Sequence, residues 1–251
     1  MSSNFNLHRA RQSLSSFHDE LAESCRDEPI NLIFKKIKTI FTYAFQNLTG
    51  RKMAQITDIS QLDLKKRYTY ADYLTWTFDD RLELIKGWIY KMSPAPKRKH
   101  QKVSFQLLMS FGNYFNSSYC EVYEAPFDVR LKKNKGSDSE VDSVVQPDIS
   151  VFCDLTKLDD RGAIDAPDLV VEITSDSTMK KDYNEKFNLY EENGVQEYWI
   201  VNPDSKSLEI FTLVNNTFES AGVFNIQDGA TEVNSIMFPE LNVNLLEIFK
   251  D

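Results

Sequence analysis

Apolar residues recur with helical spacing in one stretch near the start of the chain. From Ile30 to Leu48 they stand three or four positions apart, and Pro29 suits the first turn of a helix. The pattern predicts an amphipathic helix behind a polar, mobile tail. Residues 1–52 are thus interpreted as an N-terminal helical extension. Packing of this helix on its own domain or on a second copy is favoured, and contact with a membrane surface remains an alternative.

After Met53 the apolar pattern switches repeatedly between period two and helical spacing. Two-residue turns at Lys86-Gly87 and Asn215-Asn216 lie between alternating runs, which is typical of β-hairpins. The further elements expected are a short helix behind Thr69, a helix over residues 98–115, strands near 120–124 and 128–131, and a terminal strand plus helix. The order predicts one α/β domain over residues 53–251, with a mixed central sheet flanked by helices.

Two apolar strands between Pro147 and Pro203 each carry an acid. Asp148 opens the first strand, and Glu172 shares one face of the second strand with Val170 and Thr174. A buried carboxylate needs a cation, a lysine or water beside it. If the strands are neighbours, both acids can bind one Mg²⁺, which takes oxygen ligands and keeps several waters. The carbonyl oxygen of Ile173 is a further candidate ligand.

Plainer explanations exist for each of these residues. An aspartate at a strand start is often a turn cap, and a glutamate on an edge strand is often solvated. Lys186 follows on a predicted helix, four residues after Asp182, so a surface ion pair explains it equally well. Lys181 is interpreted as solvated and as a reserve candidate for contact with phosphate.

Charge limits the choice of partner. The formal net charge is −9, which argues against coating nucleic acid by bulk charge and leaves local basic patches open. Lys99 and His100 stand in a basic run at a predicted helix N-terminus, where backbone N–H groups favour anions. They are candidate phosphate contacts, although a solvated basic face is the default interpretation. Lys132, Lys133 and Lys135 offer a second basic patch.

Other chemistries are excluded by what the sequence lacks. The three cysteines form no CxxC pair, so we expect free thiols, no disulfide and no zinc knuckle, in a reducing cytoplasm. The sequence contains no glycine-rich phosphate loop and no HExxH motif. No apolar run approaches the roughly 18 residues of a membrane-spanning helix.

An ordered set of segments resembles a known family. PD at 147–148, EIT at 172–174, Asp182 with Lys186 and Tyr190, and GVQEYWIVNP at 194–203 are similar to the Uma-type family of restriction endonucleases, which is abundant in cyanobacteria. LELIKGWIYKMSPAP, which contains Glu83, and His100 beyond it extend the resemblance over about residues 54–251. That family belongs to the PD-(D/E)XK nuclease superfamily.

The resemblance implies a fold, a reaction and site residues. The implied fold is a restriction-endonuclease-like mixed sheet flanked by helices, and the implied reaction is hydrolysis of DNA phosphodiester bonds with Mg²⁺ or Mn²⁺. It places Asp148 and Glu172 on the metal, with Glu83 helping through water. A homodimer is a further expectation, because cutting both strands of a duplex commonly takes two active sites.

One departure from the superfamily pattern matters. Thr174 stands where a lysine is usual, so the resemblance implies that Lys186 supplies the positive charge from the following helix. Two rival functions stay open: an inert module that binds nucleic acid or a partner, and an interaction protein tethered by the helix over residues 30–48. Convergence of Asp148, Glu172 and Lys186 favours the enzyme.

Overall fold

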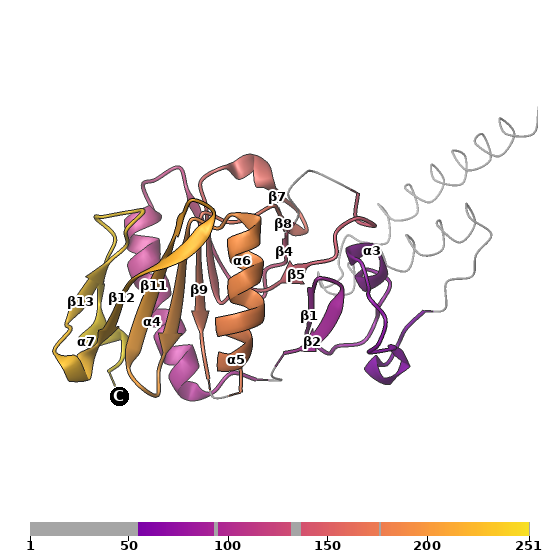
Figure 1. The fold of residues 1–251 in the computed structure, drawn as a ribbon, viewed down its shortest axis with the longest axis horizontal. Helices are drawn as coiled ribbons and strands as arrows, with labels where there is room; N and C mark the ends of the chain where they lie inside the picture. The colour runs from indigo at the N-terminus through magenta and orange to yellow at the C-terminus, as the bar shows by residue number, and fades with distance from the viewer. Residues whose placement is uncertain (1–54, 93–94, 132–136, 176, 251) are drawn as a thin grey trace, which may run out of the picture. The chain divides into compact units, whose positions relative to one another are not determined.

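The computed structural model describes residues 55–92, 95–131, 137–175 and 177–250 (Figure 1). The predicted extension over residues 1–52, the domain start at Met53 and the basic patch at Lys132, Lys133 and Lys135 lie outside these residues. The described residues fall into two compact units, one formed by 55–62 and 74–78, the other by 63–73 and 79–250. Among the described helices, none is long and apolar enough to cross a membrane.

The smaller unit is built on local hydrogen bonds. The 3₁₀-helix η1 (Ile59–Gln61) begins at Asp58, whose side chain accepts a hydrogen bond from Ser60 N, while the side chain of Gln61 accepts one from Thr57 N. A parallel bridge joins Ile56 to Trp76. These contacts form a capping box followed by one strand-like pairing.

The larger unit begins with the predicted short helix and hairpin. Helix α3 (Tyr70–Tyr73) is capped by Thr69, and strands β1 (Leu82–Ile85) and β2 (Trp88–Lys91) form the hairpin. The turn has φ of 51° at Lys86 and 81° at Gly87. A Cβ atom at Gly87 would lie 2.8 Å from Arg67 Cβ, so this turn requires glycine.

Two six-stranded sheets form the larger unit. The first has the order β2-β1-β5-β4-β8-β7, and its other strands are β4 (Val129–Arg130), β5 (Val144–Val145), β7 (Leu158–Asp159) and β8 (Gly162–Ile164). The second has the order β12-β11-β10-β9-β6-β3, with β3 (Glu121–Glu124), β6 (Ile149–Phe152), β9 (Leu169–Ile173), β10 (Glu197–Asn202), β11 (Ser207–Val214) and β12 (Thr217–Asn225). The two acid-bearing segments, β6 and β9, are neighbours in the second sheet.

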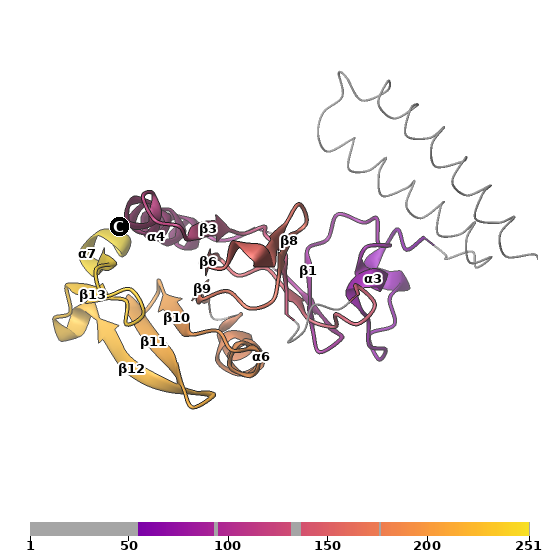
Figure 2. The same ribbon diagram turned by 90° about the horizontal axis from the view of Figure 1, so that it is seen from above.

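The second sheet is mixed and covered on both faces. Strands β9 and β10 are parallel, and their crossover is α5 (Met179–Lys181), η3 (Asp182–Lys186) and α6 (Phe187–Asn193). Seen from above, α6 lies on one side of this sheet, and α4 (Arg98–Phe115) lies on the other side with α7 (Leu245–Ile248) (Figure 2). This confirms the predicted mixed sheet flanked by helices. The first sheet was not anticipated, because most of its strands are only two or three residues long.

Each face of the second sheet has its own core. Val171 and Trp199 pack beneath α4 and α7, whereas Val170 and Tyr198 pack beneath α6 and against residues of the first sheet. Strands β9 and β10 are buried on both faces, which explains why they are largely apolar apart from Glu172 and the polar ends of β10. Strands β13 (Glu232–Asn234) and β14 (Asn242–Asn244) pair as a two-stranded antiparallel sheet just before α7. Two 3₁₀-helices also belong to the unit, η2 (Leu155–Lys157) and η4 (Ile226–Asp228).

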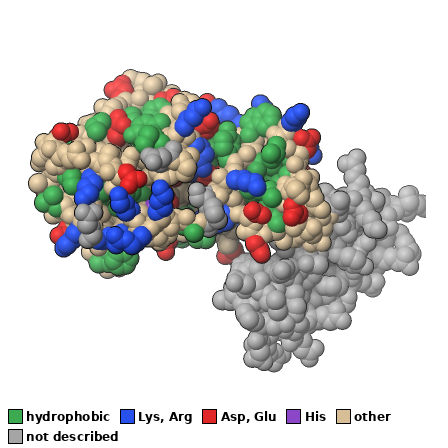
Figure 3. All heavy atoms as spheres, turned by 90° about the horizontal axis from the view of Figure 1, so that it is seen from below, with side chains coloured by type: hydrophobic (Ala, Val, Ile, Leu, Met, Phe, Trp, Pro, Cys, Tyr) green, Lys and Arg blue, Asp and Glu red, His purple; other side chains and the backbone are tan. Residues whose placement is uncertain are grey.

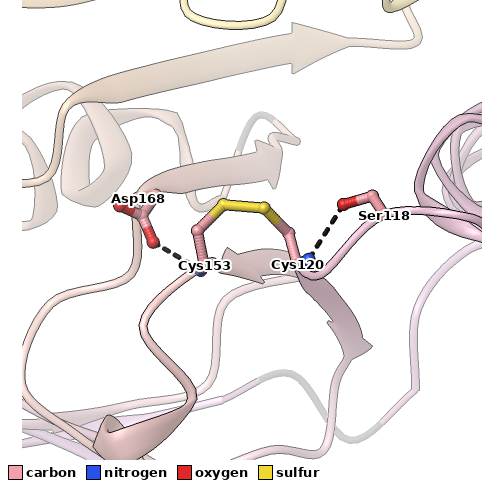
Figure 4. Close-up of a disulfide and its surroundings, with 4 residues drawn as sticks. All are labelled: Ser118, Cys120, Cys153 and Asp168. Carbon is pink, nitrogen blue, oxygen red and sulfur yellow. Dashed lines mark hydrogen bonds between the residues drawn. A yellow bond between two sulfur atoms is a disulfide. The ribbon is translucent and has the colours of Figure 1, made fainter.

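The expectation of free thiols is wrong for two of the three cysteines. Cys120 and Cys153 form a disulfide, with an S–S distance of 2.01 Å (Figure 4). They stand opposite each other where β3 begins and β6 ends, because Glu121 pairs with Phe152. Strand pairing brings them together although they are 33 residues apart in sequence, a proximity that spacing alone does not reveal. The cysteines therefore no longer support a reducing cytoplasm.

Candidate active site

Asp148 and Glu172 meet at one end of the second sheet. Strands β6 and β9 are antiparallel with Ile149 opposite Val171, so the next pair outward is Asp148 and Glu172. Opposed side chains of an antiparallel pair point to the same face. Asp148 Oδ2 also accepts a hydrogen bond of 2.7 Å from Ile173 N, which fixes one oxygen and leaves Oδ1 to other partners. The structure thus shows that the two strands are neighbours. This is the condition under which both acids were predicted to bind one ion.

Lys186 and Tyr190 hold Glu172 from the helical layer. Glu172 Oε1 accepts hydrogen bonds from Lys186 Nζ at 2.7 Å and from Tyr190 OH at 2.6 Å. Glu172 is 4% exposed and Lys186 2%. The interpretation of Lys186 as half of a surface ion pair with Asp182 is therefore wrong, because both side chains are buried.

Glu83 lies on the other side of the same lysine. Its Oε1 accepts from Lys186 Nζ at 2.8 Å and its Oε2 from Lys181 Nζ at 2.6 Å, while Gln146 N donates to Oε1. Glu83 is fully buried, and the Lys181 side chain is only 16% exposed. In the structure Glu83 is thus the counter-ion of two lysines. Lys181 is not the solvated side chain that the sequence predicted.

A π-helix explains how both lysines reach Glu83. Lys181 and Lys186 are five residues apart, which in an α-helix would turn them about 140° away from each other. Segment η3 is instead a π-helix, whose i→i+5 hydrogen bonds place residues five apart on one side. π-Turns inside helices are frequent at functional sites. The sequence gives no signal for this local change of helix type.

The buried cluster holds more acids than bases. Burial raises the pKa of Glu172 to about 8 against the effect of Lys186, and burial also raises the pKa of Asp182, whose carboxyl takes hydrogen bonds from Thr178 and Thr174. Burial alone would raise the pKa of Glu83 too, but the charges of Lys186 and Lys181 lower it to about 2.

The pKa of Lys186 changes in the opposite sense from a lone buried lysine. Burial disfavours its ammonium, but Glu172 and Glu83 raise its pKa above the ordinary value. Three carboxyl groups thus share two ammonium groups in a buried volume, so the metal-free cluster keeps a proton. Burial raises the pKa of Glu172 most clearly, which favours a proton on this carboxyl, and further positive charge in the site favours its anion.

The basic run at the start of α4 has acidic partners in the structure. His100 Nε2 lies 3.3 Å from Asp148 Oδ1, so His100 contacts the first acid of the site. Lys99 Nζ forms an exposed ion pair with Asp204 at 2.8 Å. Whether these residues also contact phosphate stays a prediction.

A cavity of about 250 Å³ joins these groups. Asp148, Glu172 and Lys186 line it together with Ile173, Thr174 and His100. In the metal-free arrangement of the described residues, no three His, Cys, Asp or Glu side chains already stand together as the ligands of one metal ion. Mg²⁺ is commonly held by one or two carboxylates and completed by water and substrate phosphate. The pair Asp148 and Glu172 fits an ion of that kind.

Sequence reasoning missed the second partner of Glu172 and the role of Lys181. Tyr190 stands in a segment that carries the family resemblance, and its ring is buried, but the sequence does not show what its hydroxyl contacts. Thr174 is buried at the usual lysine position, and Lys186 reaches Glu172 from the following helical segment.

Comparison with known proteins shows the family and the fold of this chain. A family model described as Uma2, putative restriction endonuclease, matches residues 70–245. An uncharacterized protein of Synechocystis is 29% identical over 143 residues, which cover 56% of this chain and 71% of that protein. The crystal structure of a putative nuclease from Anabaena variabilis superposes with a TM-score of 0.57 at 20% identity, covering 72% of this chain and 97% of that one.

Proposed function

We propose that this chain, which belongs to the Uma2 family of putative restriction endonucleases, hydrolyses phosphodiester bonds in DNA with the help of a divalent cation. One observation carries the proposal: Asp148 just before β6, Glu172 in β9 and Lys186 in the π-helix η3 line one cavity. Lys186 contacts Glu172 directly. The charge that Thr174 cannot supply is thus present at the second acid.

Asp148 and Glu172 are the residues that would hold the cation. A bound Mg²⁺ or Mn²⁺ lowers the pKa of a coordinated water and offsets charge on the phosphate oxygens. Lys186 donates to Glu172 and to Glu83, which accounts for two of its three N–H donors. The third can hydrogen-bond to a phosphate oxygen or to the attacking water. Glu83 acts through Lys186 and Lys181, whose positions it fixes.

The size of the cavity supports contact with the nucleic-acid backbone. A volume of about 250 Å³ corresponds to roughly eight water molecules, which is enough for a phosphate group. Basic residues also line it, namely Arg81, Lys91, Lys97, Lys99 and Lys181. Figure 3 shows several Lys and Arg side chains near one another, among acidic and apolar ones, on the face seen from below. Such a patch lets an acidic protein bind phosphate locally.

A second candidate function is supported by the state of Lys186. Its ammonium already contacts two carboxylates, and Glu172 also accepts from Tyr190. Side chains that already bind one another in this way fit a module that binds DNA without cutting it. The two functions differ in whether metal-dependent cleavage accompanies binding.

The test is nicking of supercoiled plasmid with and without Mg²⁺ or Mn²⁺, beside binding of a labelled duplex followed by fluorescence anisotropy. The variants Asp148→Asn and Glu172→Gln remove the proposed ligand charges with little change of shape. Glu219→Gln is the matched control, because Glu219 is exposed on β12 and does not line the cavity.

We expect metal-dependent nicking by the wild type and the control, and a loss of at least about a hundredfold in both site variants. Binding without nicking under any metal condition would support the inert module. Nicking that persists in both site variants would refute the assignment of the site. Cleavage of both strands by a concentration-dependent dimer would support the expected homodimer.

A further inference from the structure

The contact between His100 and Asp148 has no role in the mechanism above. His100 lies in the first turn of α4, while Asp148 precedes β6, so the two residues come from different layers of the larger unit. Both line the cavity, with side-chain exposures of 19% and 20%. The contact therefore lies where the proposed cation and substrate would enter.

The two atoms that meet are electron-pair donors for a metal. His100 Nε2 lies 3.3 Å from Asp148 Oδ1, while Asp148 Oδ2 is occupied by the N–H of Ile173. Two ligand atoms bonded at about 2.1 Å to one cation, about 100° apart, are separated by about 3.2 Å. The observed distance therefore matches two ligands that face one ion.

Among the hydrogen bonds of the described residues none joins His100 to Asp148, although the atoms are close enough. An ion that completes a triangle with Nε2 and Oδ1 lies to one side of the line between them. Ligands of a shared cation are expected to point at such an off-line position rather than at each other.

The second ring nitrogen is also uncommitted. His100 Nδ1 is buried and has no hydrogen-bond partner in the described part of the chain. Asp148 Oδ1 beside Nε2 is an acceptor that favours the ring proton on Nε2 in the metal-free protein. A cation bound at Nε2 would displace that proton, and the neutral ring would then carry its proton on Nδ1.

We propose that His100 Nε2 and Asp148 Oδ1 bind the same divalent cation, and that this nitrogen ligand makes the site favour Mn²⁺ over Mg²⁺. The inference rests on the proposed function, because it concerns the cation of the same site. Mg²⁺ prefers oxygen ligands, whereas imidazole suits transition metals. A site of two carboxylates alone would discriminate less between the two ions.

The direct test uses Mn²⁺ as the probe on the full chain. Protein labelled with ¹⁵N only in histidine is loaded with Mn²⁺, and pulsed electron paramagnetic resonance measures coupling between the metal and ¹⁵N. We expect coupling in the wild type and none in His100→Ala. The variant His8→Ala/His18→Ala changes the other two histidines of the chain and should leave the coupling intact.

Calorimetry supplies the second measurement and needs no catalytic turnover. His100→Ala should weaken Mn²⁺ binding at least about tenfold and Mg²⁺ binding less, so the ratio of the two affinities falls. Circular dichroism checks that the variant is folded. If it is not, the resonance experiment on the wild type still tests the proposal.

The outcomes separate this inference from the proposed function. Mn²⁺ binding that depends on Asp148 but shows no ¹⁵N coupling would refute the role of His100 and leave the nuclease proposal intact. An unchanged ratio of Mn²⁺ to Mg²⁺ affinity in His100→Ala would refute the claimed selectivity. Failure of the wild type to bind either cation would overturn both proposals.

Discussion

At the scale of single residues, the site is a small set of buried charges whose balance decides its protonation. Lys186 lies between Glu83 and Glu172, and Lys181 adds a second cation on Glu83. Breaking a buried ion pair by removing one partner typically costs about 3–5 kcal/mol, because the remaining charge stays buried. The free energy of unfolding should therefore depend on the protonation of these acids.

The pH dependence of stability in chelated protein should have two arms. The pKa of Glu172 is raised to about 8, so the folded state keeps a proton that the unfolded state loses near pH 4.5, and stability falls as pH rises from about 4.5 to 8. Asp182, whose pKa is also raised, adds to this arm. The pKa of Glu83 is lowered to about 2, so its contribution is present above pH 4.5 and is lost as pH falls toward 2.

Urea unfolding between pH 3 and 9 measures both arms. Glu172→Gln should flatten the upper arm and Glu83→Gln the lower arm. Because the charge of Glu83 raises the pKa of Glu172, Glu83→Gln should also move the upper arm to lower pH. A wild-type protein equally stable at pH 5 and pH 8 would show that Glu172 is ionised throughout and that the account of the charge balance is wrong.

A single hydroxyl provides a cleaner test of the same cluster. Tyr190→Phe removes the hydrogen bond to Glu172 and keeps the buried ring, so we expect a loss of about 1–3 kcal/mol in the free energy of unfolding. The matched control is Tyr183→Phe, because the Tyr183 hydroxyl contacts Glu209 at the exposed surface. The control should lose less than about 0.5 kcal/mol. Equal losses would mean that Tyr190 does not support Glu172.

At the scale of elements, hydrophobic periodicity predicted the regular helices and hairpins. It did not predict features that depend on strand pairing or on irregular helix geometry. The helix over residues 98–115 and the hairpin turns at Lys86-Gly87 and Asn215-Asn216 agree with the structure, because local spacing and turn chemistry determine them. The π-helix η3 and the disulfide between β3 and β6 depend on tertiary contacts. Neither has a local signature in the sequence.

The disulfide should stabilise the end of the sheet opposite the site. Cys120 and Cys153 close a loop of 33 residues, for which the chain-entropy model gives about 3–4 kcal/mol. The variant Cys120→Ser/Cys153→Ser should lower the free energy of unfolding by roughly that amount and remove its dependence on reductant. Cys25→Ser should keep that dependence. Reductant-independent unfolding of the wild type would contradict the bond.

At the scale of the whole molecule, the negative net charge argues against binding nucleic acid, whereas the fold is that of a nuclease. The positions of the basic residues resolve this conflict. The chain is acidic overall, yet the cavity is lined by several lysines and an arginine beside its acids. The sequence predicted the two acids, the lysine and the sheet between them, since each stands in a recognisable segment. It could not show that Glu83 contacts two lysines or that His100 contacts Asp148, because these contacts join residues distant in the chain.

The most direct test of the central claim is the anomalous scattering of Mn²⁺ in crystals of the protein bound to a short DNA duplex. The account predicts an anomalous peak within about 2.2 Å of Asp148 Oδ1, with a DNA phosphate as a further ligand inside the cavity. Mn²⁺ bound elsewhere, or DNA lying on a face away from Asp148 and Glu172, would contradict it.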